Sequence, residues 1–358
     1  MNRVVTRIVC VGAAGIAVSA SGLAGAGAAG AARAGSSGPG GSLPVYGVLN
    51  GVAATSARNA WAVGSTTSDV GKPVIVHWNG TAWKRVPSPS PPAAQLYGVA
   101  ATSATNAWAV GHTGITGTLI LHWNGTAWKQ APGPDPAYGG LSAVAATSAR
   151  NAWAVGQIKF SKTLILHWNG TAWHRVPSPT PARASAISLT AVAATSARNA
   201  WAVGQINDRK SLILHWNGTA WKRVPSPTFA PGSSISLFGV AATSARNAWA
   251  VGQINYRNTL ILHWNGTAWK PAPGQNPGPA GGLFAVAAIS ATNAWAVGPD
   301  LILHWNGAIW TQVPVPVGLD GVAATSATNA WAVGNTHPSR DVYKIVILHW
   351  NGTAWKRR

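Results

Sequence analysis

SATNAWAVGHTGITGTLILHWNGTAW, residues 103–128, is one copy of a pattern that occurs seven times in the chain. Every copy has Asn-Ala-Trp-Ala-Val-Gly, then His-Trp-Asn-Gly, then a third Trp five residues after the second. The first Trp recurs every 36 to 48 residues, and the three sets account for all 21 tryptophans. Because a repeat of this length is one supersecondary unit that stacks on its neighbours, the 358 residues are better explained by one repetitive architecture than by two domains.

Each copy contains four short segments with the composition of strands. In the second copy they are residues 98–102, 107–110, 119–123 and 127–131, called strands a, b, c and d. Asn124-Gly125 separates c from d, and Asn-Gly is a strong hairpin signal because both residues accept positive φ. Prolines after strand d prevent further pairing. The sequence therefore predicts a four-stranded antiparallel meander for each copy.

Strand c is apolar on both of its faces. Leu119, Leu121 and Trp123 alternate to one side, and Ile120 lies on the other. Such a sheet must be covered on both sides, and seven sheets around one axis cover each other. We therefore predict an all-β fold, a seven-bladed β-propeller with four antiparallel strands per blade. Its predicted core contains the first and second Trp of every copy, namely Trp61, Trp108, Trp153, Trp201, Trp249, Trp295, Trp331, Trp78, Trp123, Trp168, Trp216, Trp264, Trp305 and Trp350.

The N-terminal segment has the features of an export signal. Arg3 and Arg7 precede an apolar run that contains the only cysteine, Cys10, and Ala-x-Ala cleavage options follow. We predict a signal peptide at 1–32, a flexible leader at 33–44 and the propeller at 45–358, in a secreted, extracellular protein with no membrane span. The predicted blades are residues 45–89, 90–134, 135–179, 180–227, 228–274, 275–314 and 315–358.

The order of segments in each copy resembles a known repeat. An apolar strand, Trp-Ala-Val-Gly, a variable loop, Leu-Ile-Leu-His-Trp-Asn-Gly-Thr-Ala-Trp and Val-Pro-Ser-Pro resemble the kelch repeat of galactose-oxidase-type β-propellers. The copies are still more similar to the secreted SARNAWAVG/HWNGTAW repeat proteins of actinobacteria. The resemblance covers about residues 45–358 and implies a fold, but little about activity. Kelch repeats differ in having a double glycine, where Gly64 stands alone here, and a Tyr-Asp pair, where His-Trp stands here.

The chain is strongly basic, with 26 Lys and Arg against 6 acidic residues and a formal net charge of +20. Many of these cations lie on strand d, as Lys84, Arg85 and Lys129 do. Lys and Arg on an outer strand discourage pairing between sheet edges, and they also attract anionic polymers. The sequence leaves both explanations open. We predict no nucleic-acid partner, because export removes the chain from the compartment where nucleic acids dominate.

Two repeated polar residues are candidates for chemistry. The seven His that precede the second Trp lie on the third strand of separate blades, so neighbouring imidazoles are predicted to be about 10 Å or more apart, whereas a metal needs ligands at about 2 Å. We predict that each His is structural and bonds a backbone group or a Ser such as Ser103, and we predict no metal and no cofactor. Asn-Gly-Thr forms a glycosylation sequon in six blades, and the hairpin turn explains it without sugar.

The chain lacks the residues that known propeller enzymes use for catalysis. Glycosidases need paired carboxylates, but the chain has no Glu and six scattered Asp. The copper site of galactose oxidase uses a Tyr crosslinked to a Cys, and the predicted mature chain has no Cys. We predict no catalytic residue and no enzyme activity.

Binding is predicted on one face of the ring. In a meander the b–c and d–a loops share this face, here called the loop face, and the a–b and c–d turns share the opposite turn face. The loop-face segments vary between copies, as binding surfaces do, although duplication followed by drift explains the variation equally well. The predicted ligand-binding residues are Gln157, Lys159, Phe160, Gln205, Arg209, Lys210, Gln253, Tyr256, Arg257, Arg340 and Tyr343.

Three functions remain open at this stage. The first is a secreted, monomeric, non-catalytic binding module or scaffold that recognises an extracellular protein, a cell-surface polysaccharide or an anionic wall polymer through the loop face. The alternative is a multivalent carbohydrate-binding lectin, which would need a similar pocket in each blade, whereas a scaffold would use one uneven patch. The third, a propeller enzyme of galactose-oxidase-like or hydrolase type, is disfavoured by the missing residues.

Overall fold

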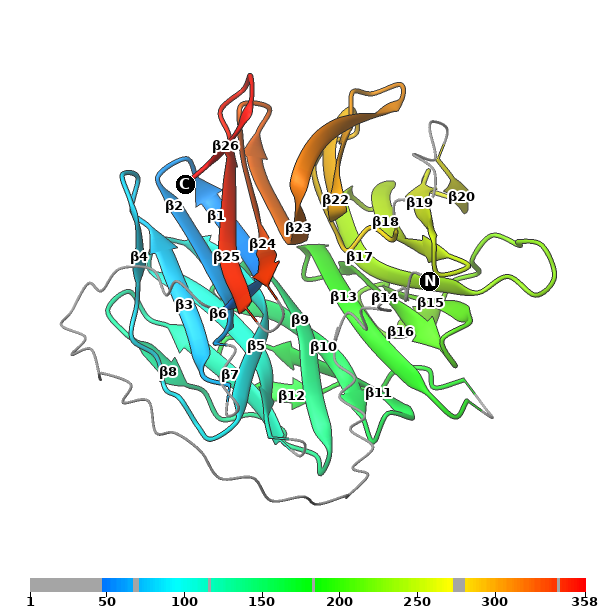
Figure 1. Cartoon of the computed structure of the whole chain (residues 1–358). Helices are drawn as coiled ribbons and strands as arrows, with labels where there is room; N and C mark the ends of the chain where they lie inside the picture. Colours follow the sequence, from blue (N-terminus) through cyan, green and yellow to red (C-terminus); the bar gives the residue numbers. More distant parts are fainter. Residues whose placement is uncertain (1–46, 67–70, 115–116, 182–183, 273–280, 340–341) are drawn as a thin grey trace, which may run out of the picture.

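The computed structural model describes residues 47–66, 71–114, 117–181, 184–272, 281–339 and 342–358, and every regular element in them is a β-strand (Figure 1). The predicted signal peptide and leader, residues 1–44, lie outside these ranges. Within the described ranges no helix has the length and apolar character needed to span a membrane.

Blades one to five are separate sheets of four antiparallel strands in chain order. Blade one contains β1 (Val48–Ser56), β2 (Asn59–Ser65), β3 (Pro73–Trp78) and β4 (Trp83–Arg85). Blade two contains β5 (Ala94–Ser103), β6 (Asn106–Thr113), β7 (Gly117–Trp123) and β8 (Trp128–Gln130). Blade three contains β9 (Gly139–Ser148), β10 (Asn151–Ile158), β11 (Lys162–Trp168) and β12 (Trp173–Arg175). Blade four contains β13 (Ile187–Ser196), β14 (Asn199–Ile206), β15 (Lys210–Trp216) and β16 (Trp221–Arg223), and blade five contains β17 (Ile235–Ser244), β18 (Asn247–Ile254), β19 (Asn258–Trp264) and β20 (Trp269–Pro271).

Blades six and seven are joined into one sheet of six labelled strands, β21 (Ala285–Ser290), β22 (Asn293–Trp305), β23 (Trp310–Ser326), β24 (Asn329–Ser339), β25 (Val342–Trp350) and β26 (Trp355–Arg357). The b–c turn of blade six is only Pro299-Asp300, so β22 contains both strands b and c. Pro299 also pairs with Gly318, so β23 contains strand d of blade six and strand a of blade seven. Trp295 stacks on His304 at 4.1 Å, which places the two halves of β22 side by side as in the other blades. The predicted seven-bladed all-β fold is confirmed.

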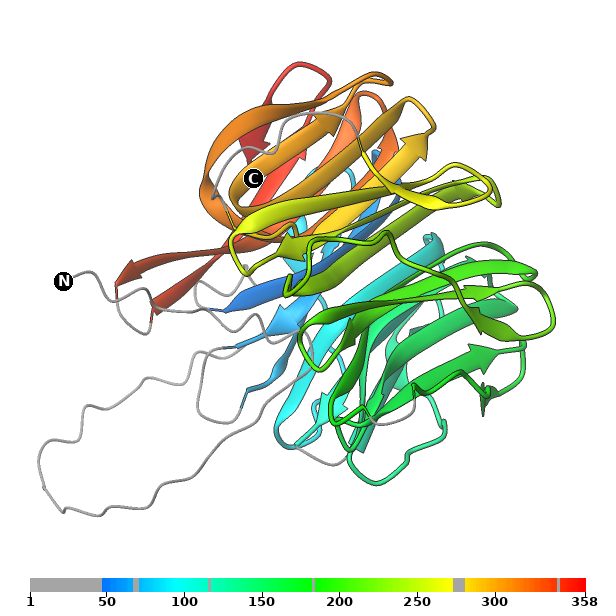
Figure 2. The ribbon, with the colours of Figure 1, turned by 90° about the vertical axis from the view of Figure 1, so that its right-hand side faces the viewer.

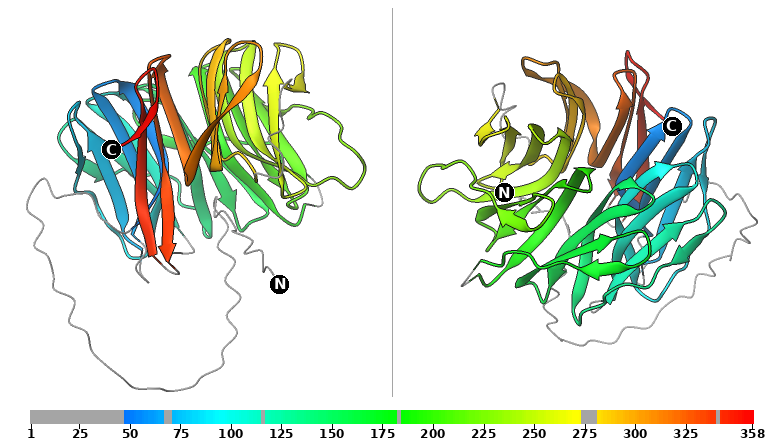
Figure 3. Two further views of the ribbon diagram at one scale, coloured as in Figure 1. Left: turned by 45° about the horizontal axis from the view of Figure 1, so that its top comes forward. Right: turned by 180° about the vertical axis from the view of Figure 1, so that it is seen from behind.

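Seven hydrophobic clusters hold the ring together, one between each pair of neighbouring blades. Figures 2 and 3 show the blades following one another around a common centre. The last cluster closes the ring, because Trp331 of blade seven packs against Leu49 and Trp83 of blade one. The Gly47 amide also donates to the Tyr343 carbonyl oxygen at 2.9 Å. Each blade is built from one continuous segment, so hydrophobic packing rather than an exchanged strand closes the circle.

The three sets of tryptophans differ in how deeply they are buried. The first set is at most 1% exposed. The third set packs edge-on against the first set of the preceding blade, as Trp221 does on Trp153 with a ring separation of 5.2 Å. All second-set residues belong to the seven hydrophobic clusters or pack against them. Trp78 and Trp305 are buried, and the others, such as Trp123, are partly buried. Their indole N–H donates to a carbonyl of the a–b turn, Ala104 in this case, and this bond holds the ring at the turn face.

The repeated histidines belong to a structural network. Strand register places each His opposite the first Trp, so the two rings stack, at 4.2 Å for His167 and Trp153. His167 Nε2 also lies 2.8 Å from Asn151 Oδ1, and Asn151 Nδ2 donates to Thr147. The prediction of a backbone or Ser partner was therefore wrong, because the Asn two residues before the Trp reaches the same face. Burial lowers the pKa of each of these seven His, which favours the neutral form.

Candidate functional site

A β-bulge in the inner strand builds the centre of the loop face. In blades one to five and seven, the register shifts by one residue opposite the Gly of Trp-Ala-Val-Gly. Gly156 shows why glycine stands there, because a Cβ at this position would meet the carbonyl oxygen of Gly140. A bulge re-aims the extra residue of the strand, and in blade three that residue is Ser142.

The bulged residues converge on the centre of the ring. They line a cavity of about 220 Å³ to which the inner strands of all seven blades contribute. The side chains at these equivalent positions are Asn50, Tyr97, Ser142, Thr190, Phe238, Phe284 and Asp320. The chemical group at this position therefore differs from blade to blade. It is an amide, a phenol, a hydroxyl, a phenyl ring or a carboxylate. The sevenfold repeat thus breaks down around this central cavity.

A second, smaller pocket lies beside this cavity between blades two and three. Tyr97 and Ser142 line both hollows, and His112, Tyr138 and Phe160 complete the wall of the smaller one. Its volume is about 50 Å³, which accommodates roughly three to five water-sized groups. The pocket therefore suits a single side chain or a small substituent.

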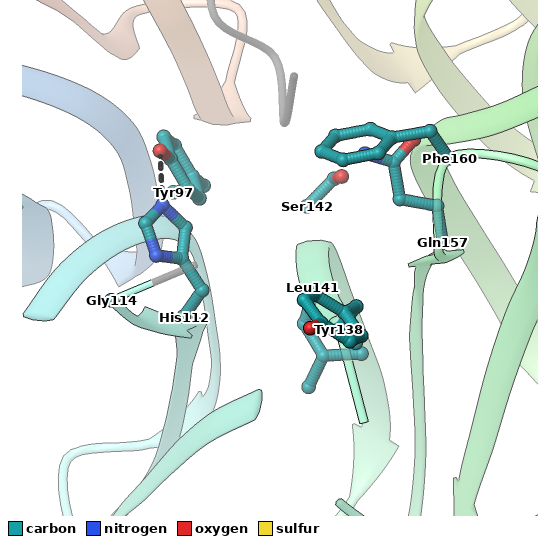
Figure 4. Close-up of a pocket in the computed structure, with 10 residues that line it drawn as sticks. Tyr97, His112, Gly114, Tyr138, Leu141, Ser142, Gln157 and Phe160 are labelled. Atoms are coloured by element: carbon teal, nitrogen blue, oxygen red, sulfur yellow. Dashed lines mark hydrogen bonds between the residues drawn. The ribbon is translucent and has the colours of Figure 1, made fainter. Parts of the chain in front are cut away.

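One wall of the pocket is fixed by hydrogen bonds. Tyr97 Oη lies 2.8 Å from His112 Nε2 and donates to Gln95 Oε1 at 2.8 Å. Burial lowers the pKa of His112, so the neutral ring can donate its Nε2–H to Tyr97 while Tyr97 donates onward. Figure 4 shows Tyr97 and His112 facing Phe160 and Gln157 across the opening. The aromatic wall is thus held in place before any ligand arrives.

Exposed aromatic residues with strained backbone surround the loop face. Tyr138, Phe160 and Tyr256 are 50%, 44% and 57% exposed, and their φ angles are 61°, 56° and 61°. A side chain in the left-handed region costs of order 1–3 kcal/mol. Phe160 and Tyr256 are central residues of tight b–c turns in which both central residues have positive φ, as type I′ hairpin turns require. Lys159, with a φ of 50°, also places its ammonium 5.9 Å from the Tyr138 ring centroid. Three aromatic rings are therefore exposed to solvent on the loop face.

The structure separates the predicted ligand-binding residues into groups. Gln157 and Phe160 line the aromatic pocket, and Lys159 lies beside it. Arg209 and Lys210 line a different cavity, at the outer end of blade four. Tyr256 Oη donates to the Asp208 carbonyl oxygen at 3.3 Å and links the b–c loops of blades four and five.

The other predicted residues have local roles or lie elsewhere. Gln205 Nε2 donates to Asp208 Oδ1 at 2.7 Å, and Gln253 is next to Gly282. The Arg257 carbonyl oxygen accepts a bond from the Gly281 amide. Tyr343 takes part in ring closure through its carbonyl oxygen, and Arg340 lies outside the described residues.

Three pocket residues were missed by sequence reasoning. Tyr97, His112 and Tyr138 lie outside the repeated motif and are not among the predicted ligand-binding residues. The signal that could have found them is an aromatic ring at a position where other blades have a small or polar residue. Position 97 is such a case, because its equivalents include Asn50 and Ser142.

Aromatic and neutral polar groups line most of the pocket. It contains one imidazole, two phenols, a phenyl ring and a carboxamide, and no carboxylate lines it. Across the ranges that the structure describes, no group of three or more His, Cys, Asp or Glu is placed to hold a metal ion.

Comparison with known proteins supports the fold. No protein-family model and no curated protein sequence matches the chain. Solved structures match along most of its length. The structure titled Ycf48 bound to D1 peptide has a TM-score of 0.60 and 17% identity, over 86% of this chain and 93% of that one. The fold is that of a β-propeller.

Two further propellers are similar. Ycf48 from Cyanidioschyzon merolae has a TM-score of 0.58 and 15% identity, covering 87% of this chain and 97% of its own. The SapL1 lectin in complex with α-methyl fucoside has a TM-score of 0.54 and 10% identity, covering 88% and 96%. At these identities the likeness extends to the propeller fold alone. The resemblance to kelch repeats and to secreted actinobacterial repeat proteins stays a prediction.

Proposed function

We propose that this chain is a secreted, non-catalytic binding protein that holds an extracellular peptide or protein segment on its loop face. The aromatic pocket formed by Tyr97, His112, Tyr138 and Phe160 would anchor one side chain of that segment. The observation that carries this proposal is the fixed aromatic pocket beside exposed aromatic residues.

The uneven loop face favours a scaffold over a multivalent lectin. A lectin of that kind repeats its pocket, yet Tyr97, Tyr138 and Phe160 occupy positions that differ from blade to blade. The half-buried second-set Trp rings do repeat, but their indole N–H groups are already bonded to the a–b turns. An extended segment, in contrast, can place one side chain in the pocket and other groups over the mixed mouth of the channel.

Two further arguments support the remaining parts of the proposal. Secretion rests on the basic and apolar N-terminal sequence with its small-residue cleavage options. A binding role accords with two similar propellers, Ycf48 bound to a D1 peptide and the SapL1 lectin in complex with α-methyl fucoside. The lack of Glu argues against carboxylate-pair hydrolysis.

Selection from a random peptide library tests the pocket. Peptides selected on the wild-type protein are expected to bind the double variant Tyr138→Ala/Phe160→Ala at least about tenfold more weakly, since two aromatic anchors are lost. Titration calorimetry or fluorescence polarisation measures the difference. Ile309→Ala is the matched control, because Ile309 is 49% exposed in the c–d turn of blade six, on the turn face.

A glycan array probed in parallel decides between ligand classes. The proposal fails if the selected peptides bind the double variant as well as the wild type. It also fails if the protein binds defined glycans with an affinity that the double variant loses, while no peptide is selected. That second result would favour the lectin alternative.

A further inference from the structure

Each blade has two equivalent positions on the outer rim of the ring where a cationic residue can stand. In every blade either both positions are cationic or neither is. One is five residues before the repeated His, at the start of strand c, and the other is two residues after the third Trp, in strand d. Four blades have a Lys and an Arg there, namely Lys72 with Arg85, Lys162 with Arg175, Lys210 with Arg223, and Lys344 with Arg357. The other three have neither, namely Gly117 with Gln130, Asn258 with Pro271, and Pro299 with Gln312. Edge protection needs no such coupling, because either cation alone would serve it.

The fold brings the two members of a pair to the same place. In blade four, Lys210 and Arg223 line one cavity of about 640 Å³. In blade seven, Arg357 Nη2 lies 3.4 Å from the carbonyl oxygen of Ile345, the residue next to Lys344. All eight side chains are exposed, so their charged groups are accessible to a ligand.

The segments between the two members of each pair contain no acidic residue, although Asp69, Asp208 and Asp341 stand two or three residues before the lysine in three of the four blades. No Asp or Glu occurs in residues 72–85, 162–175, 210–223 or 344–357. Two cations at one site repel each other. A bound anion offsets this repulsion because it is attracted to both cations. A planar guanidinium binds phosphate, sulfate or carboxylate with two parallel hydrogen bonds, and a lysine adds a mobile point charge.

The blade-four cavity also has an apolar wall and hydroxyl groups. Phe229 and Pro227 give it an apolar wall, and Ser226 and Ser233 contribute hydroxyls. Its volume lies in the range of small-molecule sites. An apolar ring, hydroxyls and three cations, Arg209 together with the pair, match a sugar ring that carries an acidic group.

We propose that the four Lys–Arg pairs are anion sites for a linear acidic polysaccharide, with a sulfate, phosphate or uronate group held at each pair. Blades three and four adjoin each other, as do blades seven and one across the ring closure. The sites therefore form two rim segments separated by blades that lack the pair. They are distinct from the aromatic pocket and do not depend on the ligand proposed there.

Heparin, a sulfated polysaccharide, serves as the probe. The double variant Lys210→Gln/Arg223→Gln is expected to bind heparin about tenfold more weakly than the wild type at moderate salt, because two charge-assisted contacts are lost. The control is Lys222→Gln/Lys270→Gln, which removes the same net charge from exposed strand-d lysines outside the pairs. This control is expected to lose less than about twofold, and uncharged dextran is expected not to bind.

Equal losses in the two double variants would show that only overall charge matters, and would overturn the proposal. So would failure of the wild type to bind heparin, or equally tight binding of a DNA duplex with the same dependence on Lys210 and Arg223. The pocket variant Tyr138→Ala/Phe160→Ala is expected to retain heparin binding. The rim proposal and the pocket proposal therefore fail separately.

Discussion

Replacing Trp331 with alanine is expected to lower the free energy of unfolding by about 3–5 kcal/mol, the range typical of a large aromatic removed from a core. Trp331 is fully buried where the last blade meets the first. It packs edge-on against Trp83 at 5.0 Å and stacks on His349 at 4.2 Å. The substitution leaves a cavity in the cluster that closes the ring. Equilibrium unfolding in urea measures the effect.

Ile309→Ala is the control for this experiment, because Ile309 is 49% exposed in the c–d turn of blade six, where the other blades have Ala. Its stability is expected to remain within about 0.5 kcal/mol of the wild type. A loss below about 1 kcal/mol for Trp331→Ala would mean that blades one and seven do not pack as described.

Gly156→Ala is expected to destabilise the protein by about 3 kcal/mol, at the upper end of the usual cost of overpacking. The added Cβ would meet the backbone carbonyl oxygen of Gly140, which cannot move without breaking the pairing of β9 with β10. Because Gly156 is opposite the bulge that places Ser142 in the wall of the central cavity and of the aromatic pocket, the variant is also expected to bind any loop-face ligand more weakly.

Gly140→Ala provides a control in the same pair of strands. A Cβ on Gly140 would meet only the Cβ of His112, at 3.8 Å, so a change of less than about 0.5 kcal/mol is expected. Thermal and urea unfolding of both variants test the difference. Equal stability of the two would show that the glycine of Trp-Ala-Val-Gly does not accommodate a bulge.

The repeat made the architecture predictable, because strand composition and the two apolar faces of strand c require blades that cover each other. The c–d turn was predicted correctly in position but not in conformation. Only Gly125 has positive φ, at 97°. Asn124 instead uses its side-chain carbonyl to accept bonds from Thr126 and the Ala127 amide, because the loop has four residues.

The candidate site was less predictable, since it depends on register and on contacts between blades. Variation in the loops pointed to Gln157 and Phe160, and both line the pocket. Nothing in the spacing indicated that a bulge would turn Tyr97 toward the channel. The partnership of Tyr97 with His112 likewise arises only when β5 and β6 pair.

Hydrogen exchange of the Trp331 indole N–H, followed by NMR, tests the closed ring most directly. If seven blades enclose these rings, this N–H exchanges as slowly as that of Trp153, which is equally buried inside an uninterrupted part of the ring. Rapid exchange at Trp331 with slow exchange at Trp153 would contradict the account, because it would show that the first and last blades are apart.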